Sequence, residues 1–185
     1  MDQSFVKDKE VITSMTCSSS GKYFIVGSVN LKIWKEDKYT TSYSLHASFD
    51  KPYIESFSAS IAGSSPQITA VAITKDDVIV LTGSAVSNTH AGIKMFDTRL
   101  KKCVRTFENF HKRSIQNIQI TNDHKVISCD VASTIAVWDF NQTKPKFYYQ
   151  NSAIGTTYAL IASDISPVIV HAGGGLAIDK TAELQ

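Results

Sequence analysis

One frame of short apolar segments returns four times along the chain, and this repetition constrains the fold more than any other feature. The clearest copy ends with the stretch from Val126 to Asp139, where two short segments rich in Ile, Val, Thr and Trp flank a turn of small residues. Such residues suit the pleated, half-buried surface of a β-strand. In each copy a first apolar segment and a polar turn lead into a similar pair of segments. The four copies begin at Ile12, Ile68, Ile115 and Thr157.

A further segment of alternating polarity follows each of the first three copies. These segments occupy residues 41–45, 102–107 and 146–150, and lysines flank them. Alternation with flanking lysines is typical of an edge strand protected against stray pairing. We therefore predict units of four antiparallel strands, each with its last strand outermost.

The bulk composition excludes several classes of protein. The chain has 185 residues and a net charge of +2, so nothing electrostatic requires a nucleic acid or an acidic membrane as partner. No apolar run approaches the ~18 residues of a membrane helix, and residues 1–10 contain no apolar signal core. Three widely spaced cysteines, Cys17, Cys103 and Cys129, favour reduced, buried thiols. We expect a protein of the cytoplasm or nucleus.

The ending Trp138-Asp139 on an apolar strand, repeated in weaker form in the other copies, resembles the WD repeat, the unit of a β-propeller blade. The copies start 56, 47 and 42 residues apart, against about 40–45 residues for a WD repeat. The first interval contains an insertion. The resemblance implies an all-β fold, a WD-type β-propeller of about four blades in one domain spanning residues 1–185. The predicted repeats are 11–50, 67–107, 114–150 and 156–180.

The resemblance also implies a buried hydrogen-bonded set of His, Ser, Asp and Trp in each repeat. Repeat three supplies His111, Ser128 and Trp138 at the matching positions, whereas Ala132 stands where the aspartate is expected. A repeat that lacks one member has to satisfy the remaining buried polar groups in another way. We therefore expect divergent blades that depend more on apolar packing.

The strand endings of the other repeats depart further from the family pattern. Repeat one keeps Trp34 but has Lys35 in place of the aspartate, and repeat two ends in Phe96-Asp97. With Asp139 of repeat three, these residues complete the predicted structural set.

Closure of the ring is left open by the sequence. Four blades could form a small ring or remain an open arc. An arc would either be a fragment of a larger propeller or need a second copy or another chain to cover its exposed face. Residues 3–7 stand where an outer strand precedes repeat one, which is the strand offset by which WD propellers close. That segment could complete the last blade or merely follow an unseen preceding repeat.

No motif supports catalysis or a cofactor. Gly173-Gly174-Gly175 lacks the helix that a dinucleotide site requires, and a turn explains it better. The five histidines show no metal-ligand spacing with each other or with cysteine. We expect neither enzymatic activity nor a bound cofactor or metal.

The most consistent function is that of a protein-interaction scaffold within a larger complex. Two long connections, 56–67 and 85–92, and the inter-blade stretch 109–114 are the predicted docking loops. Candidate partner-binding residues are Asn88, His90, Lys112 and Arg113. Two alternatives remain: a WD-repeat factor associated with RNA or ribosome assembly, and a reader of phosphorylated or ubiquitin-bearing ligands.

Overall fold

The computed structural model describes residues 10–53, 66–85, 91–107, 110–150, 159–163, 168–172 and 176–180. Every regular element among them is a β-strand. The strands are β1 (Ser14–Cys17), β2 (Tyr23–Gly27), β3 (Leu31–Glu36), β4 (Tyr43–Phe49), β5 (Ile68–Ile73), β6 (Ile79–Ser84), β7 (Ile93–Asp97), β8 (Lys102–Thr106), β9 (Ile115–Ile120), β10 (Lys125–Asp130), β11 (Thr134–Asp139), β12 (Phe147–Gln150), β13 (Ala159–Ala162), β14 (Val168–Ala172) and β15 (Leu176–Lys180).

The strands form four separate antiparallel sheets in chain order. Three sheets have four strands, β1 to β4, β5 to β8 and β9 to β12, and the described part of the fourth has three, β13 to β15. In the four-stranded sheets each strand pairs with the next along the chain, so the last strand is an edge. The predicted all-β architecture of four blades is confirmed, and we refer to the sheets as blades one to four.

The same polar turn joins the first two strands of blades one, two and three. A hydroxyl oxygen accepts the backbone N–H of the residue that starts the second strand: Ser18 from Tyr23, Thr74 from Ile79 and Thr121 from Lys125. One residue near the end of each turn has positive φ, and these residues are Gly21, Asp77 and His124. Gly tolerates that conformation freely, and Asp and His adopt it more readily than most residues. The sequence therefore fixes three equivalent hairpins although the turn residues differ.

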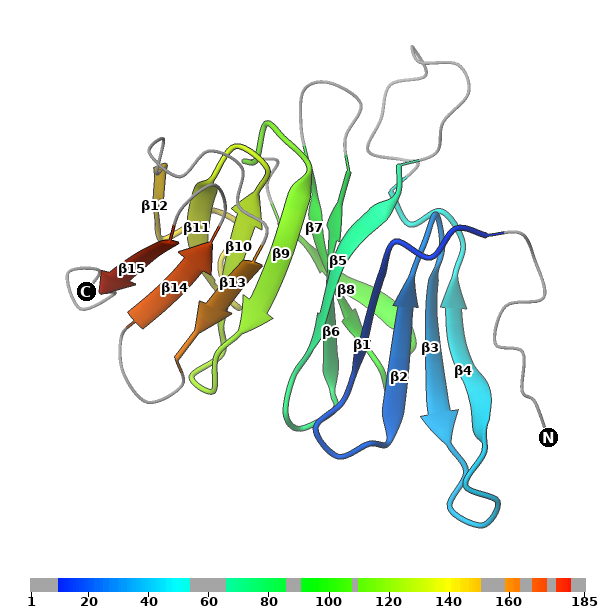
Figure 1. Ribbon diagram of the computed structural model, residues 1–185. Coiled ribbons are helices and arrows are strands. Elements are labelled where there is room, and N and C mark those ends of the chain that lie inside the picture. The colour runs from blue at the N-terminus through cyan, green and yellow to red at the C-terminus, as the bar shows by residue number, and fades with distance from the viewer. Residues whose placement is uncertain are drawn as a thin grey trace.

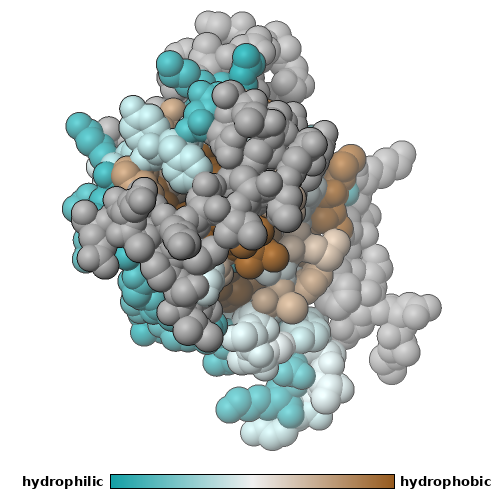
Figure 2. All heavy atoms as spheres, turned by 60° about the vertical axis from the view of Figure 1, so that its left-hand side comes forward, coloured by the Kyte–Doolittle hydropathy of each residue, from teal (hydrophilic) through white to brown (hydrophobic). Residues whose placement is uncertain are grey.

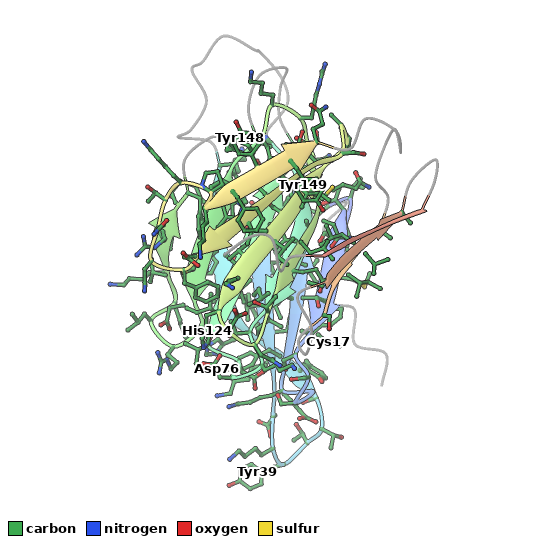
Figure 3. The ribbon with its side chains drawn as sticks, turned by 90° about the vertical axis from the view of Figure 1, so that its left-hand side faces the viewer. Cys17, Tyr39, Asp76, His124, Tyr148 and Tyr149 are labelled. Atoms are coloured by element: carbon green, nitrogen blue, oxygen red, sulfur yellow. The ribbon has the colours of Figure 1, made fainter. Side chains whose placement is uncertain are left out.

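Aspartates inside two of these turns have lowered pKa values. The Thr74 hydroxyl donates to Asp76, and this bond is the main cause that lowers the pKa of Asp76; the His124 charge adds to it. Asp76 and His124 lie near each other at one end of the blades in Figure 3. The Thr121 hydroxyl donates to Asp123, which is also paired with Lys125, and both lower the pKa of Asp123.

Neighbouring blades meet through their first strands, because β5 contacts both β1 and β9, and β9 contacts β13 (Figure 1). Apolar clusters fill the spaces between them. Between blades one and two lie Ile25, Ile33, Ile68, Val80 and Phe96, among others. Between blades two and three lie Leu81, Ile93, Ile115, Val126 and Trp138. The described part of the cluster between blades three and four includes Cys129, Leu160 and Ile169.

The close approach of the blades requires glycine at one position of the second strand. A Cβ added at Gly83 would lie 2.5 Å from Ile115 Cγ2, and one added at Gly27 would lie 2.7 Å from Ile68 Cγ2. Real Cβ contacts essentially never come so close, so each isoleucine fills the space that the missing side chain leaves. A hydroxyl beside each contact completes it, since Thr69 donates to Ile115 O and Thr13 to Ile68 O.

The four blades are arranged as an arc in which blades one and four lie at opposite ends (Figure 1). Large apolar side chains stay exposed on or beside the first strands of these end blades: Val11, Ile12 and Met15 in blade one, and Ile161 in blade four. Apolar surface is visible across the middle of the face in Figure 2. Of the two arrangements left open by the sequence, the described residues have the open arc.

Two further expectations can be compared with the structure. The expectation of buried thiols is wrong for Cys17 and Cys103, which are exposed because they lie on an innermost and an outermost strand, and holds for Cys129. The predicted strand at residues 3–7 lies outside the described residues.

A substitution of Gly83 by Ala tests the blade contact. We expect a loss of about 1–3 kcal/mol in the free energy of unfolding, because the methyl group overpacks against Ile115. Urea denaturation followed by tryptophan fluorescence measures it. Ile115→Leu removes the Cγ2 atom, so the double variant should lose less than the sum of the single variants. Strict additivity would contradict the proposed contact.

The turn aspartates predict a pH dependence. Their folded pKa values lie below the unfolded value of about 3.9, so they stabilise the folded state above that value, and this contribution disappears as the pH falls through the folded pKa values. Thermal unfolding of the Asp76→Asn/Asp123→Asn variant between about pH 5 and pH 2.5 should therefore show a shallower loss of Tm than the parent chain. Parallel curves would show that these carboxylates do not contribute.

Candidate functional site

Blade three contains a buried series of side-chain hydrogen bonds that joins the segment before β9 to strands β10 and β11. The indole N–H of Trp138 donates to Ser128 Oγ at 2.8 Å. His111 Nε2 lies 2.7 Å from the same oxygen, and His111 Nδ1 lies 3.0 Å from Asp130 Oδ2. All four side chains are almost completely buried. These hydrogen bonds thus anchor the segment before β9 to strands β10 and β11.

The donor and acceptor inventory assigns a consistent set of protons. An ionised Asp130 only accepts, so His111 Nδ1–H donates to it; Ser128 O–H then donates to His111 Nε2 and accepts from Trp138. Asp130 Oδ1 also accepts the backbone N–H groups of Ala132 and Thr134, at 2.9 and 3.0 Å. Every polar side-chain atom of these four residues has a hydrogen-bond partner, as burial requires.

The expectation that repeat three lacks its aspartate is wrong. Ala132 lies in the turn after the second strand, but β10 extends to Asp130, and this residue, two positions earlier, is the aspartate of the set. Asp130 ends that strand and points back to His111. The available signal was the Ser-Cys-Asp sequence of residues 128–130, which places the Ser and Asp side chains on one face of a strand.

Blade two has a different polar contact at the equivalent register. Phe96 pairs with Val80 as Trp138 pairs with Val126, so Thr82 takes the position of Ser128. The phenol of Tyr53, 1% exposed, donates to Thr82 O at 2.8 Å and lies 2.6 Å from Thr82 Oγ1. Burial raises the pKa of Tyr53, which keeps the phenol neutral. Sequence reasoning missed Tyr53 because an insertion separates it from β5.

The aspartates predicted at the strand ends differ in what they do. Asp97 Oδ1 accepts the backbone N–H groups of Leu100 and Arg99, at 2.9 and 2.8 Å, and these bonds, the one from Leu100 above all, lower the pKa of Asp97. In blade one, where Lys35 stands at that register, Asp37 caps the turn instead, accepting from Tyr39 and Thr40.

Trp34 and Asp139 are the remaining two residues of the predicted structural set. Trp34 lies on β3 in register with Phe24 and is half-buried. Asp139 ends β11, is half-buried, and accepts the backbone N–H of Gln142 with its main-chain oxygen. No side-chain hydrogen bond of Asp139 is found within the described ranges.

The three predicted docking connections have their described ends together at one end of blades two and three. The N–H of Ala85 donates to Gln67 O at 2.7 Å, which joins the ends of the first two connections. The N–H of Ala91 donates to His111 O at 2.7 Å, which joins the second to the third. In Figure 1 this end lies at the top, where β5 and β9 begin. We call this set, Gln67, Ala85, Ala91 and His111 with its neighbours Lys112 and Arg113, the connection end.

The four candidate partner-binding residues fall into two groups. Lys112 and Arg113 are exposed at the connection end, directly after the buried His111. Because His111 is held on both ring nitrogens and Val131 N–H donates to Ser114 O at 3.0 Å, the backbone that carries the two cations is fixed on either side. Asn88 and His90 lie outside the described residues.

The described residues contain neither a candidate metal site nor a candidate membrane-spanning helix. No group of three or more His, Cys, Asp or Glu side chains that could hold a metal ion is found there. Among the described residues there is no helix long and apolar enough to cross a membrane.

The hydrogen-bonded residues of blade three predict that two aspartates contribute unequally to the free energy of unfolding. Asp130→Ala should lower the free energy of unfolding by about 2–4 kcal/mol, because it leaves the His111 ring and two backbone N–H groups without their acceptor. Asp139→Ala should cost less than about 1 kcal/mol, as a surface substitution would. Chemical denaturation of both variants measures the difference. Equal losses would contradict the assignment of Asp130 as the buried member.

No protein-family model and no curated protein matches the sequence. Solved structures do match, and 1145 chains resemble this fold, so the likeness is to a large structural class. One is Sqt1 of Chaetomium thermophilum, a WD40 β-propeller, in its structure bound to the N-terminus of the ribosomal protein L10. The TM-score is 0.69 at 16% sequence identity, over 91% of this chain and 43% of that chain. The present chain thus spans less than half the length of Sqt1, and its fold is that of a WD-repeat β-propeller.

Proposed function

We propose that the chain is a non-catalytic scaffold that binds other proteins at the connection end of blades two and three. The observation that carries this proposal is the convergence of three connections from two neighbouring blades, joined by the bonds Ala85 to Gln67 and Ala91 to His111. Connections held by a rigid sheet scaffold are where binding residues concentrate. The described ends of these connections are held together by hydrogen bonds in the absence of a partner. Such preorganisation lowers the entropic cost of binding.

The basic pair Lys112 and Arg113 gives this surface a chemical preference. Both side chains are exposed, and their backbone is anchored by the buried His111. Charges at the rim of an interface mainly steer the encounter and raise the association rate. A partner with acidic residues facing this end fits best.

The likeness to Sqt1 supports a protein partner in a second way. That propeller binds the N-terminal segment of another protein, the ribosomal protein L10. By analogy of fold, we propose that the present chain also takes a segment of a partner protein, as a component of a larger complex in the cytoplasm or nucleus. The same likeness favours association with ribosome assembly as the second candidate function. Recognition of a phosphorylated or ubiquitin-bearing ligand would use the same two cations.

The experiment compares charge reversal at the connection end with charge reversal elsewhere. The chain carrying Lys112→Glu and Arg113→Glu should capture its partner proteins several-fold less well than the parent, as measured by quantitative mass spectrometry of proteins retained on the immobilised chain. The control carries Lys38→Glu and Lys144→Glu, two exposed cations away from this end, and should capture them unchanged.

Nuclease treatment and a salt series separate direct capture of proteins from capture through RNA. Capture through RNA would be lost on nuclease treatment and would fall steeply with salt, because binding to nucleic acid releases counterions. Capture that survives nuclease and depends on Lys112 and Arg113 supports the scaffold. Equal capture by both charge-reversed chains would contradict docking at the connection end.

A further inference from the structure

A cavity of about 300 Å³ opens between the outer strand of blade one and the last two strands of blade two. Phe49 and Phe96 form its apolar wall, with ring centroids 4.6 Å apart. Pro52, Lys94, Cys103 and the rim residues Asp50 and Lys51 complete the lining. The volume is at the lower limit for sites that take small molecules, so it suits one or two side chains better than a cofactor.

The one cation in the wall of this cavity is held mainly by neutral groups. Lys94 is 9% exposed, and its ammonium donates a hydrogen bond to Pro52 O and lies 5.3 Å from the centre of the Tyr53 ring. Within the described ranges no carboxylate lies at ion-pair distance from Lys94. Buried charges are normally paired, so the ammonium has capacity for an anionic partner.

Blade one shows what such a lysine does when the chain supplies the anion. Lys32 pairs with Val26 as Lys94 pairs with Thr82, and both lysines come one residue after the strand position that faces the blade-contact glycine. Lys32 Nζ lies 3.1 Å from Glu10 Oε2, and Ser28 and Asn30 also donate to that carboxylate. At Lys94 the corresponding partners are a carbonyl and an aromatic face.

We propose that this cavity, the blade one–two pocket, binds an acidic side chain of a partner protein, with its carboxylate on Lys94 and a neighbouring apolar side chain against Phe49 and Phe96. The proposal rests on the scaffold function and names the kind of segment that the scaffold takes. A carboxylate gives the Lys94 ammonium the anionic partner that no described residue supplies. The half-buried Phe49, packed against the buried Phe96, supplies the apolar contact that an ion pair alone lacks. Charge-assisted hydrogen bonds of this kind are among the stronger ones.

The rim argues for a single carboxylate rather than a polyanion. Asp50 is exposed and lines the same cavity as Lys51, so the two rim charges offset each other. A phosphate chain or nucleic-acid backbone would bring several negative charges toward Asp50 for the one buried cation. One acidic residue with an apolar neighbour matches the pocket in charge and in size.

The test uses two peptides that differ in one group: acetyl-Ser-Phe-Glu-Phe-Ser-amide and its Phe-Gln-Phe counterpart. Each is titrated into the full chain and followed by 1H–15N NMR. We expect saturable shifts at Phe49, Phe96 and Cys103, and a Kd for the Gln peptide weaker by about tenfold or more. Lys94→Met should weaken the Glu peptide to the same extent. The control Lys102→Met, an exposed lysine on β8 that does not line the pocket, should bind as the parent does.

Glu55, which lies outside the described residues, is the first acidic residue in the sequence after the pocket residue Pro52, and the Glu55→Gln variant identifies the source of the anion. Unchanged binding of the Glu peptide by this variant supports an external carboxylate. Markedly tighter binding would overturn the proposal, because the chain's own carboxylate would then be the occupant.

Three further results would overturn the pocket while leaving the scaffold intact. They are equal affinities for the two peptides, shifts confined to other blades, and no saturation in the millimolar range. If Lys94→Met captures partner proteins as well as the parent chain does, the pocket is not their binding site. The scaffold itself fails only if no partner depends on the connection end.

Discussion

The structure depends on how closely each blade approaches the next. Gly27 and Gly83 leave room for Ile68 and Ile115, and Thr13 and Thr69 donate to the main-chain oxygens of the same two isoleucines. A single four-stranded sheet cannot bury both of its faces, and the contact with the next blade supplies the missing cover. The apolar clusters between blades follow from this spacing. In blade three Cys129 stands at the position of the glycine, and its side chain is part of the cluster toward blade four.

Blades one, two and three share this apolar frame but differ in their buried hydrogen bonds and ion pairs. Blade three has the complete chain of His111, Ser128, Asp130 and Trp138. Blade two replaces it with Tyr53 and Thr82, and blade one places Glu10 on Lys32. All three devices attach the segment that enters a blade to its second or third strand. The propeller frame thus tolerates different chemistry at one position, which explains how the fold persists at 16% identity to Sqt1.

The sequence predicted the strands and their order well, because the apolar frame and the turn residues repeat. Hydroxyl and aspartate residues such as Thr74 and Asp76 mark the turns locally, and local signals can be found in a single sequence. The site was harder to predict. Asp130 was missed by two residues because strand ends are the least certain part of such a prediction, and Tyr53 was missed because it meets Thr82 only across an insertion. The cavity at Lys94 combines residues of two blades, which no local pattern reveals.

Binding and architecture are connected through the same blade contacts. The connection end presents Lys112 and Arg113 because His111 is buried. The blade one–two pocket lies where Phe49 of β4 packs against Phe96 of β7, between the two blades that meet at Gly27. Native-state hydrogen exchange tests this account most directly. If the blades are interlocked, the slowest amides of β5, β6, β9 and β10 should exchange with one common opening free energy, equal to that of global unfolding. Distinct opening free energies for blades two and three would contradict it, because the blades would then be independent units.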